Sequence, residues 1–260
     1  MKKHICFTLF ILTTLGSCTL NKAKINNDLK KHFDSEHVTG NFTLLNNQSG
    51  NVMVYNMELD TQRISPGTSF KIINSLIGLE TGKIVDSKTP IIIDGKSIPL
   101  TEAFKNSITA YFQDVARRVG KDTLQKTIDS IQYGNKNLSG AVDSFWLNNH
   151  LKISPDEQVG LVYRLYFDKL PFSKYAQESV RTLMKHEENT LFKYYYATGT
   201  GVDEKNNPIG WVIGWVEENL HVYFFSTLVK SADKSMDMDS VSLKITKGIL
   251  TELGYFKGNK

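Results

Sequence analysis

The order of segments along the chain predicts an α+β protein, in which an antiparallel sheet flanked by helices carries a second, mostly helical lobe. Two β-rich runs, residues 40–45 and 51–56, surround a short Asn/Gly loop. A mostly helical stretch, residues 86–186, follows, and β-rich segments return after residue 194. A layered domain of this kind places its default ligand site in the cleft between the lobes.

The N-terminus reads as a targeting segment. Lys2 and Lys3 precede a short apolar run that is too short to be a permanent membrane span, and Leu-Gly-Ser leads to Cys18. This ending resembles the lipobox of bacterial lipoproteins. We therefore expect residues 1–17 to be a signal peptide, Cys18 to carry a lipid that anchors an exported cell-envelope protein to a membrane, and residues 18–31 to be a tether. The alternative is an ordinary secretory signal with a chance cysteine.

Composition excludes several classes of partner and site. The only other cysteine, Cys6, leaves with the signal peptide, so the mature chain has neither a disulfide nor cysteine ligands for zinc. The six histidines show no metal-ligand spacing, and we expect no metal. The formal charge of +4 falls to +2 without Lys2 and Lys3, and the lysines are scattered. Nucleic acid is therefore not an expected partner.

Residues 32–260 hold the predicted elements. The two β-rich runs form a hairpin, and residues 68–80 form a helix that is apolar on several sides and hence buried, ending at Gly82. Residues 107–119 form an amphipathic helix ending at Gly120. Further on, Ser154-Pro155-Asp156-Glu157 has the residues of a capping box with proline at the first helical position. The last elements are strands over residues 194–198, 209–217 and 220–229 and a helix with an apolar face at Ile245, Ile249, Leu250 and Leu253.

The segment with the clearest chemistry is Thr68-Ser69-Phe70-Lys71 at the start of the buried helix. Residues three apart share a helix face, so the Lys71 amine can reach the Thr68 hydroxyl. A hydroxyl beside a lysine is how acyl-transferring serine enzymes activate a nucleophile. Taken as isolated residues, Lys71 would simply pair with a carboxylate and Ser107 would cap its helix.

A set of ordered motifs carries a family resemblance. The chain resembles the class D serine β-lactamases (oxacillinases) of the penicillin-recognising superfamily, over nearly the whole mature sequence. The matching landmarks are residues 66–82, Ser107-Ile108-Thr109, Tyr133-Gly134-Asn135, Phe145-Trp146-Leu147, Ala197-Thr198-Gly199 and residues 211–217. The resemblance implies a β-lactamase/transpeptidase-like fold.

The resemblance also implies roles for single residues. Thr68 stands at the nucleophile position and Lys71 at the general base, which the class D enzymes carboxylate; no other cofactor is expected. Ser107 would relay protons and Trp146 would hold the lysine carbamate.

In the substrate-binding part of the site, the oxyanion would be held by the backbone N–H groups of Thr68 and Thr200. Thr109, Thr198 and Gly199 would line the place of a β-lactam or peptidoglycan-like small molecule.

Several positions depart from the family pattern. Thr68 replaces the serine, and its β-methyl restricts rotation about χ1. Ser69 is no substitute, because two residues before Lys71 it faces away from the amine. Ala197 replaces the lysine of the Lys-Thr-Gly strand, and Lys193 is too far along the strand to take its place. Ser242 aligns with the arginine that binds the substrate carboxylate in the family.

A further departure is Thr109, which replaces an aliphatic residue and makes the pocket around Lys71 more polar. Carboxylation needs a neutral lysine amine, and an apolar pocket favours that neutral form.

These departures lead to three functional hypotheses. The first is a class D-like β-lactamase, a hydrolase whose acylation and hydrolysis of β-lactams we expect to be weak or lost. The second is a non-catalytic envelope protein that binds, senses or scaffolds. The third is a relative of the cell-wall transpeptidases or carboxypeptidases.

Overall fold

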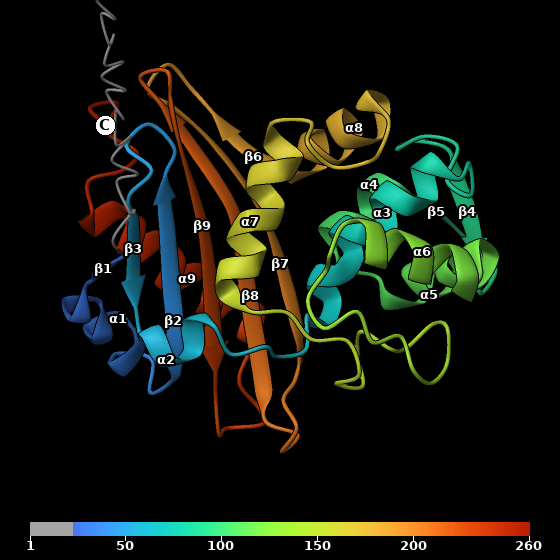
Figure 1. Ribbon diagram of the computed structural model, residues 1–260, viewed down its shortest axis with the longest axis horizontal. Helices are drawn as coiled ribbons and strands as arrows, with labels where there is room; N and C mark the ends of the chain where they lie inside the picture. The colour runs from blue at the N-terminus through green and yellow to red at the C-terminus, as the bar shows by residue number, and fades with distance from the viewer. Residues whose placement is uncertain (1–22) are drawn as a thin grey trace, which may run out of the picture.

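The computed structural model describes residues 23–260, so the predicted signal peptide and Cys18 lie outside the described residues. Within this range, seven strands form one sheet in the order β1-β3-β2-β9-β8-β7-β6 (Figure 1). All neighbouring strands are antiparallel except β1 and β3. The strands are β1 (Lys24–Ile25), β2 (Thr39–Asn46), β3 (Val52–Tyr55), β6 (Lys185–Glu188), β7 (Phe192–Val202), β8 (Pro208–Glu218) and β9 (His221–Lys230).

Helices cover both faces of this sheet. Along β8, Trp211, Ile213 and Trp215 point into one apolar core, and Val212 and Val216 point into the other, as the two-residue period of a strand requires. In Figure 1, α7 (Pro155–Tyr166) lies on the first face, while α9 (Met238–Glu252) and α1 (Lys30–Asp34) lie on the second. This confirms the predicted antiparallel sheet between helices.

The second lobe lies beside β7, on the right of Figure 1. It contains α3 (Lys71–Glu80), α4 (Leu100–Lys105), α5 (Thr109–Val119), α6 (Lys121–Ser130) and α8 (Lys174–Met184). It also contains a small hairpin that the sequence analysis missed, β4 (Pro90–Ile93) and β5 (Lys96–Pro99). Asp94 and Gly95 both have positive φ, as a two-residue I′ turn needs, and Asp-Gly is a strong signal for that turn.

Two of the predicted helices begin differently from the expectation. The buried helix starts with a 3₁₀ turn, η2 (Gly67–Phe70), and becomes α-helical at Lys71. The amphipathic helix starts at Thr109, so Ser107 lies in the turn before it and is not its cap. The capping box of Ser154 and Glu157 at the start of α7 is confirmed.

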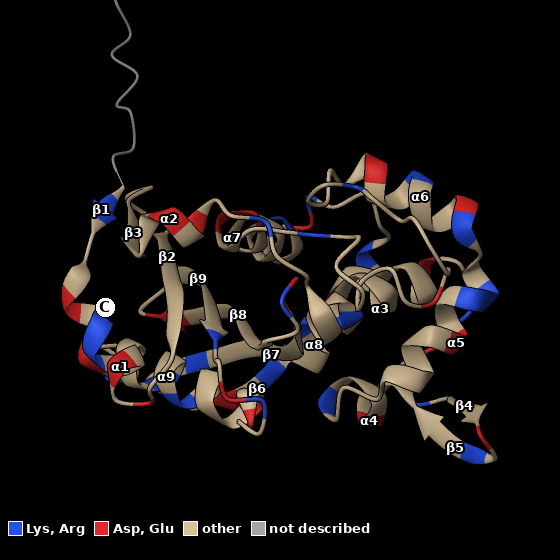
Figure 2. Ribbon diagram, turned by 90° about the horizontal axis from the view of Figure 1, so that it is seen from below, with Lys and Arg blue, Asp and Glu red and all other residues tan. Residues whose placement is uncertain are grey.

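The remaining short elements are η1 (Asn27–Leu29) and α2 (Met57–Asp60), which precede and follow the first hairpin strands. Over residues 23–260, every helix is too short or too polar to cross a bilayer. Acidic and basic residues are interspersed over both lobes in Figure 2.

Candidate active site

A cleft of about 560 Å³ lies between the sheet and the helical lobe. Its walls come from α3, α4, α8, β6, β7 and the N-terminal part of α9. Residues that matter for its chemistry are Lys71, Phe104, His186, Ala197, Thr198 and Asp239. Over the described part of the chain, no three acidic, histidine or cysteine side chains gather closely enough to hold a metal ion.

Two glycines let η2 approach strand β7 closely. A Cβ on Gly67 would lie 2.2 Å from the Thr200 carbonyl oxygen, and φ at Gly67 is +53°. A Cβ on Gly199 would lie 2.2 Å from the backbone nitrogen of Ser69. Real Cβ atoms cannot approach backbone atoms so closely, so glycine is needed at both positions. This contact brings Thr68 against β7 from 132 residues away in the sequence.

The two predicted oxyanion-hole residues meet at this contact. The Thr200 N–H donates a hydrogen bond of 2.8 Å to Thr68 Oγ1. The Thr68 hydroxyl therefore occupies the Thr200 N–H group, which was expected to donate a hydrogen bond to a substrate carbonyl oxygen. Within residues 23–260, Thr68 Oγ1 forms no hydrogen bond with Lys71.

Lys71 is buried, with 3% of its surface exposed, and its Nζ donates a 2.7 Å hydrogen bond to Ser107 Oγ. The amine also lies 5.0 Å from the centre of the Phe104 ring. Burial lowers the pKa of Lys71 to about 8, and the negative charge of Asp239 acts in the opposite direction. About a tenth of the molecules therefore hold Lys71 neutral at pH 7. In the described chain Lys71 forms no ion pair, so it does not simply pair with a carboxylate.

Ser107 reaches Lys71 from the turn between α4 and α5, where its φ of +49° is unusual for a residue other than glycine. Left-handed backbone at a non-glycine residue stores about 1–3 kcal/mol and is common at functional sites. The contact brings the predicted proton relay and the predicted base together.

Trp146 and Thr109 do not contact the amine through hydrogen bonds in the part of the chain that the structure describes. The Trp146 ring stacks on Phe70, with 5.3 Å between centroids, and meets Phe145 edge-on at 4.8 Å. Thr109 is the half-buried first residue of α5. The structure therefore shows Trp146 as a core residue beside the active-site helix.

Ser69 faces away from the cleft, as the sequence analysis expects. Its hydroxyl donates to the Pro66 carbonyl at 2.7 Å and accepts from Gln158 Nε2 at 3.3 Å, and its side chain is buried. These bonds fix η2 to α7, so Ser69 holds the helix start rather than acting as a nucleophile.

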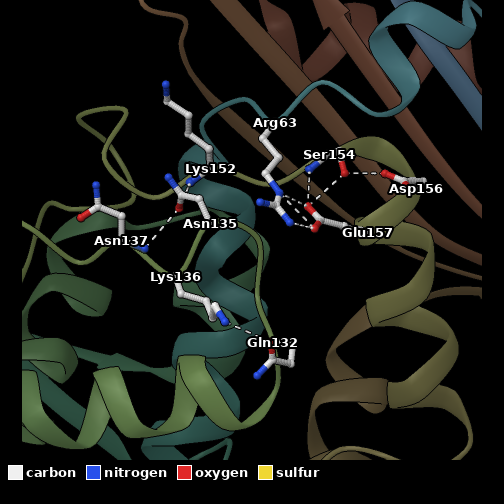
Figure 3. Close-up of polar contacts among 9 residues, drawn as sticks. All are labelled: Arg63, Gln132, Asn135, Lys136, Asn137, Lys152, Ser154, Asp156 and Glu157. Atoms are coloured by element: carbon white, nitrogen blue, oxygen red, sulfur yellow. Dashed lines mark hydrogen bonds and ion pairs between the residues drawn. The ribbon is translucent and has the colours of Figure 1, made fainter.

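A group of polar contacts behind η2 fixes the segment that leads into it. Figure 3 shows Arg63 and Glu157 facing each other, and Arg63 Nε lies 3.0 Å from both Glu157 oxygens. Asn135 accepts the Lys152 N–H at 3.0 Å, and its amide donates to the His150 carbonyl at 2.7 Å. We call Arg63, Asn135, Lys152, Ser154 and Glu157 the back network.

The back network explains why the Tyr-Gly-Asn landmark is present. A Cβ on Gly134 would lie 1.8 Å from the Lys152 carbonyl oxygen, and φ at Gly134 is +50°. The landmark therefore holds the loop before α7 in place, and none of its three residues lines the cleft.

The sequence matches the family model of the penicillin binding protein transpeptidase domain over residues 30–251. Beta-lactamase OXA-19 of Pseudomonas aeruginosa is 33% identical over 95% of this chain and 96% of its own length. The chain belongs to the class D β-lactamase branch of the penicillin-binding transpeptidase family.

Two further similar proteins are informative. Regulatory protein BlaR1 of Bacillus licheniformis is 30% identical over 88% of this chain, which corresponds to 39% of that longer protein. The crystal structure of FUS-1 (OXA-85), a class D β-lactamase from Fusobacterium nucleatum, superimposes with a TM-score of 0.83 at 30% identity, covering 90% of this chain and 100% of that structure.

Ala197 carries no charge on the strand where the sequence analysis places the substrate side of the site. Ala197 is buried at the lysine position of β7. Lys193 is no replacement, because its amine lies 3.3 Å from Glu188 and 3.9 Å from Glu217, and it does not line the cleft.

The start of α9 contributes a charged residue to the cleft that the sequence analysis did not name. Ser242, aligned with the family arginine, is fully buried against β8 and donates to the Met238 carbonyl at 2.6 Å. Asp239 and Ser240 line the cleft instead. The sequence analysis missed Asp239. A signal was available, because Asp237 and Asp239 both stand at the start of one helix and only one of them can be its N-cap. Asp237 is that cap.

Proposed function

We propose that this protein recognises β-lactams or similar acyl compounds in the cleft and turns them over weakly or not at all. The observation that carries this proposal is the position of the Thr68 hydroxyl. It accepts the Thr200 N–H at 2.8 Å, while Lys71 is bonded to Ser107 instead. Nucleophile and base are therefore not joined by the hydrogen bond that activation requires.

The threonine side chain explains why this arrangement is hard to leave. For attack, Thr68 Oγ1 must leave the Thr200 N–H, so that the substrate carbonyl oxygen takes this donor. Rotation about χ1 moves the hydroxyl and swings the β-methyl into another position beside β7. A serine has no methyl to place. Since a misplacement of about 1 Å can lower a rate about 100-fold, Thr68 supports slow acylation.

A non-catalytic sensing role is the second candidate. It is supported by the similarity to the regulatory protein BlaR1, which covers most of this chain. A sensor needs recognition and at most one slow acylation, and both are compatible with a buried Lys71 that is mostly protonated at pH 7. Carboxylation of Lys71 would require its neutral form, which increases as the pH rises through about 8.

Attachment to the cell envelope through a lipid on Cys18 is part of the proposal. It is supported by the signal-like residues before Cys18. Mass spectrometry of the protein from membranes tests it, and an unmodified N-terminus that retains residues 1–17 would refute it.

Turnover of a chromogenic cephalosporin by the purified protein, with and without bicarbonate, tests the catalytic part. We expect a barely detectable rate under both conditions. Turnover at about 1–1000 per second, the usual enzymatic range, would refute weak catalysis. Intact-mass analysis after incubation with benzylpenicillin tests recognition: an adduct on Thr68 would indicate acylation without release, and an adduct on Ser69 would refute the assignment of Thr68.

A further inference from the structure

The cleft contains an acidic side chain that has no structural task. Asp239 lies in the first turn of α9 and lines the same cleft as Lys71, Ala197 and Thr198. Its Oδ1 atom is buried and has no hydrogen-bond partner. The cap of α9 is Asp237, which accepts the Ser240 N–H at 3.2 Å and the Ser240 hydroxyl at 2.6 Å. Asp239 is therefore not needed to cap the helix.

Within residues 23–260 Asp239 forms no ion pair, although its charge acts on Lys71 from a longer distance and raises the pKa of that amine. Lys71 is bonded to Ser107, and Lys185 is paired with Glu188 at 3.0 Å. Lys105 is exposed on α4 and Asp239 forms no ion pair with it within residues 23–260. His186 is exposed and stacks on Tyr196 with 3.6 Å between ring centroids; partial desolvation lowers its pKa, and the positive charges of Lys71, Lys247 and Lys105 lower it further.

A buried carboxylate oxygen without a donor is unfavourable, and a ligand that supplies a cationic donor relieves this. The hydroxyl-bearing residues Thr198 and Ser240 line the same cleft and offer further acceptors for such a group. A ligand carboxylate in this place would meet a like charge, with Ala197 where the family has a lysine. Desolvation strengthens both effects.

We propose that Asp239 makes this cleft select acyl compounds that carry an ammonium group where penicillins carry a carboxylate. The inference rests on the proposed function, because it places the ligand in the same cleft. It specifies a ligand charge opposite to that of the carboxylate which the family arginine is expected to bind.

Three ligands that differ only in this group test the inference: benzylpenicillin, its methyl ester and its 2-aminoethyl ester. Calorimetric titration of the purified protein at pH 7 and low salt gives the three dissociation constants. We expect the ammonium ester to bind at least about ten times more tightly than benzylpenicillin, with the neutral ester between them, and this preference to fall as salt is added.

Asp239→Asn should reduce the preference to about threefold or less, while Asp233→Asn, which removes a nearby exposed charge outside the cleft, should retain it. Unfolding midpoints of both variants establish that they are folded. Equal binding of all three ligands, or a preference that Asp239→Asn leaves unchanged, would overturn the inference and leave the proposed function standing.

The variant Lys105→Met tests whether the cleft instead prefers a ligand carboxylate. If benzylpenicillin binds most tightly and Lys105→Met weakens it, the cleft selects carboxylates through Lys105 and the inference is wrong. If none of the three ligands binds at millimolar concentration, the proposed function fails together with the inference.

Discussion

The two sides of the active-site helix start differ in how their charges are paired. In the back network, Arg63 is paired with Glu157, and Lys152 is paired with Glu204. In the cleft, Lys71 is buried without an ion pair in the described chain, and Asp239 has a buried oxygen without a partner. The ion pairs behind η2 are therefore formed, while these two charged groups of the cleft have no ion-pair partner within residues 23–260.

This difference indicates that the fold and the reaction depend on separate residues. Removing a back-network contact should destabilise the protein, whereas removing a polar group near the cleft should leave it unchanged or stabilise it. Measurements of the free energy of unfolding for variants on the two sides can therefore test this distinction.

The largest effect is expected behind η2. Gly134→Ala places a Cβ about 1.8 Å from the Lys152 carbonyl oxygen at a φ of +50°, so the loop must move. We expect a loss of about 4 kcal/mol or more in the free energy of unfolding, measured with urea. Gly82→Ala is the matched control, since Gly82 also has positive φ but nothing within 4 Å, and it should lose only about 1–2 kcal/mol. Equal losses would show that Lys152 does not constrain position 134.

On the cleft side, Lys71→Met should stabilise the protein. The pKa of Lys71 is lowered from 10.5 to about 8 in the folded protein, so the unfolded chain binds the proton more tightly. Below pH 8 this destabilises the fold by about 2–3 kcal/mol. The stability of the wild type should rise between pH 8 and 10.5, and the advantage of Lys71→Met should disappear over this range.

Urea unfolding of both proteins at pH 7 and pH 10 measures this effect. A destabilised Lys71→Met variant at pH 7 would mean that the bond from Lys71 to Ser107 outweighs the burial of the charge.

The smallest effect is expected one turn along α3 from Lys71. Asn74 is buried, and neither its amide nitrogen nor its oxygen has a hydrogen-bond partner within residues 23–260. Asn74→Leu should therefore be neutral or stabilising by about 1 kcal/mol.

Asn41 is the matched control for Asn74. It is equally buried, but its amide donates to the Tyr55 carbonyl at 2.9 Å and its oxygen accepts the Thr43 hydroxyl at 3.1 Å. Asn41→Leu should be destabilised by about 2 kcal/mol or more. A similar loss for both variants in thermal unfolding would show that Asn74 has a partner, such as a bound water.

The sequence predicts the sheet and the main helices because their signals are local. Strand β8 is rich in β-branched and aromatic residues and is buried along almost its whole length, and the capping box at Ser154 depends on residues three apart. The hairpin of β4 and β5 was missed because its Asp94-Gly95 turn lies within a stretch dominated by helical patterns.

The site is harder to predict because its decisive contacts are not local. The rotamer of Thr68 depends on Thr200, and the approach of these residues depends on Gly67 and Gly199. Asp239 lines the cleft while Ser242, three residues further on, is buried against β8, and both placements depend on how the start of α9 packs on a sheet formed by residues distant in the sequence.

The acylation rate of wild type and Thr68→Ser/Ala197→Lys, followed by intact mass with benzylpenicillin, tests the separation of fold from reaction most directly. The double variant carries a serine at position 68, whose hydroxyl can rotate freely about χ1, and a cationic side chain at position 197. We expect it to be acylated about 100-fold faster than the wild type under conditions in which both proteins are folded, although a lysine at the buried position 197 should lower the urea midpoint. Rapid acylation of the wild type, or a double variant that is no faster although folded, would contradict the view that the reaction has been lost at these positions alone.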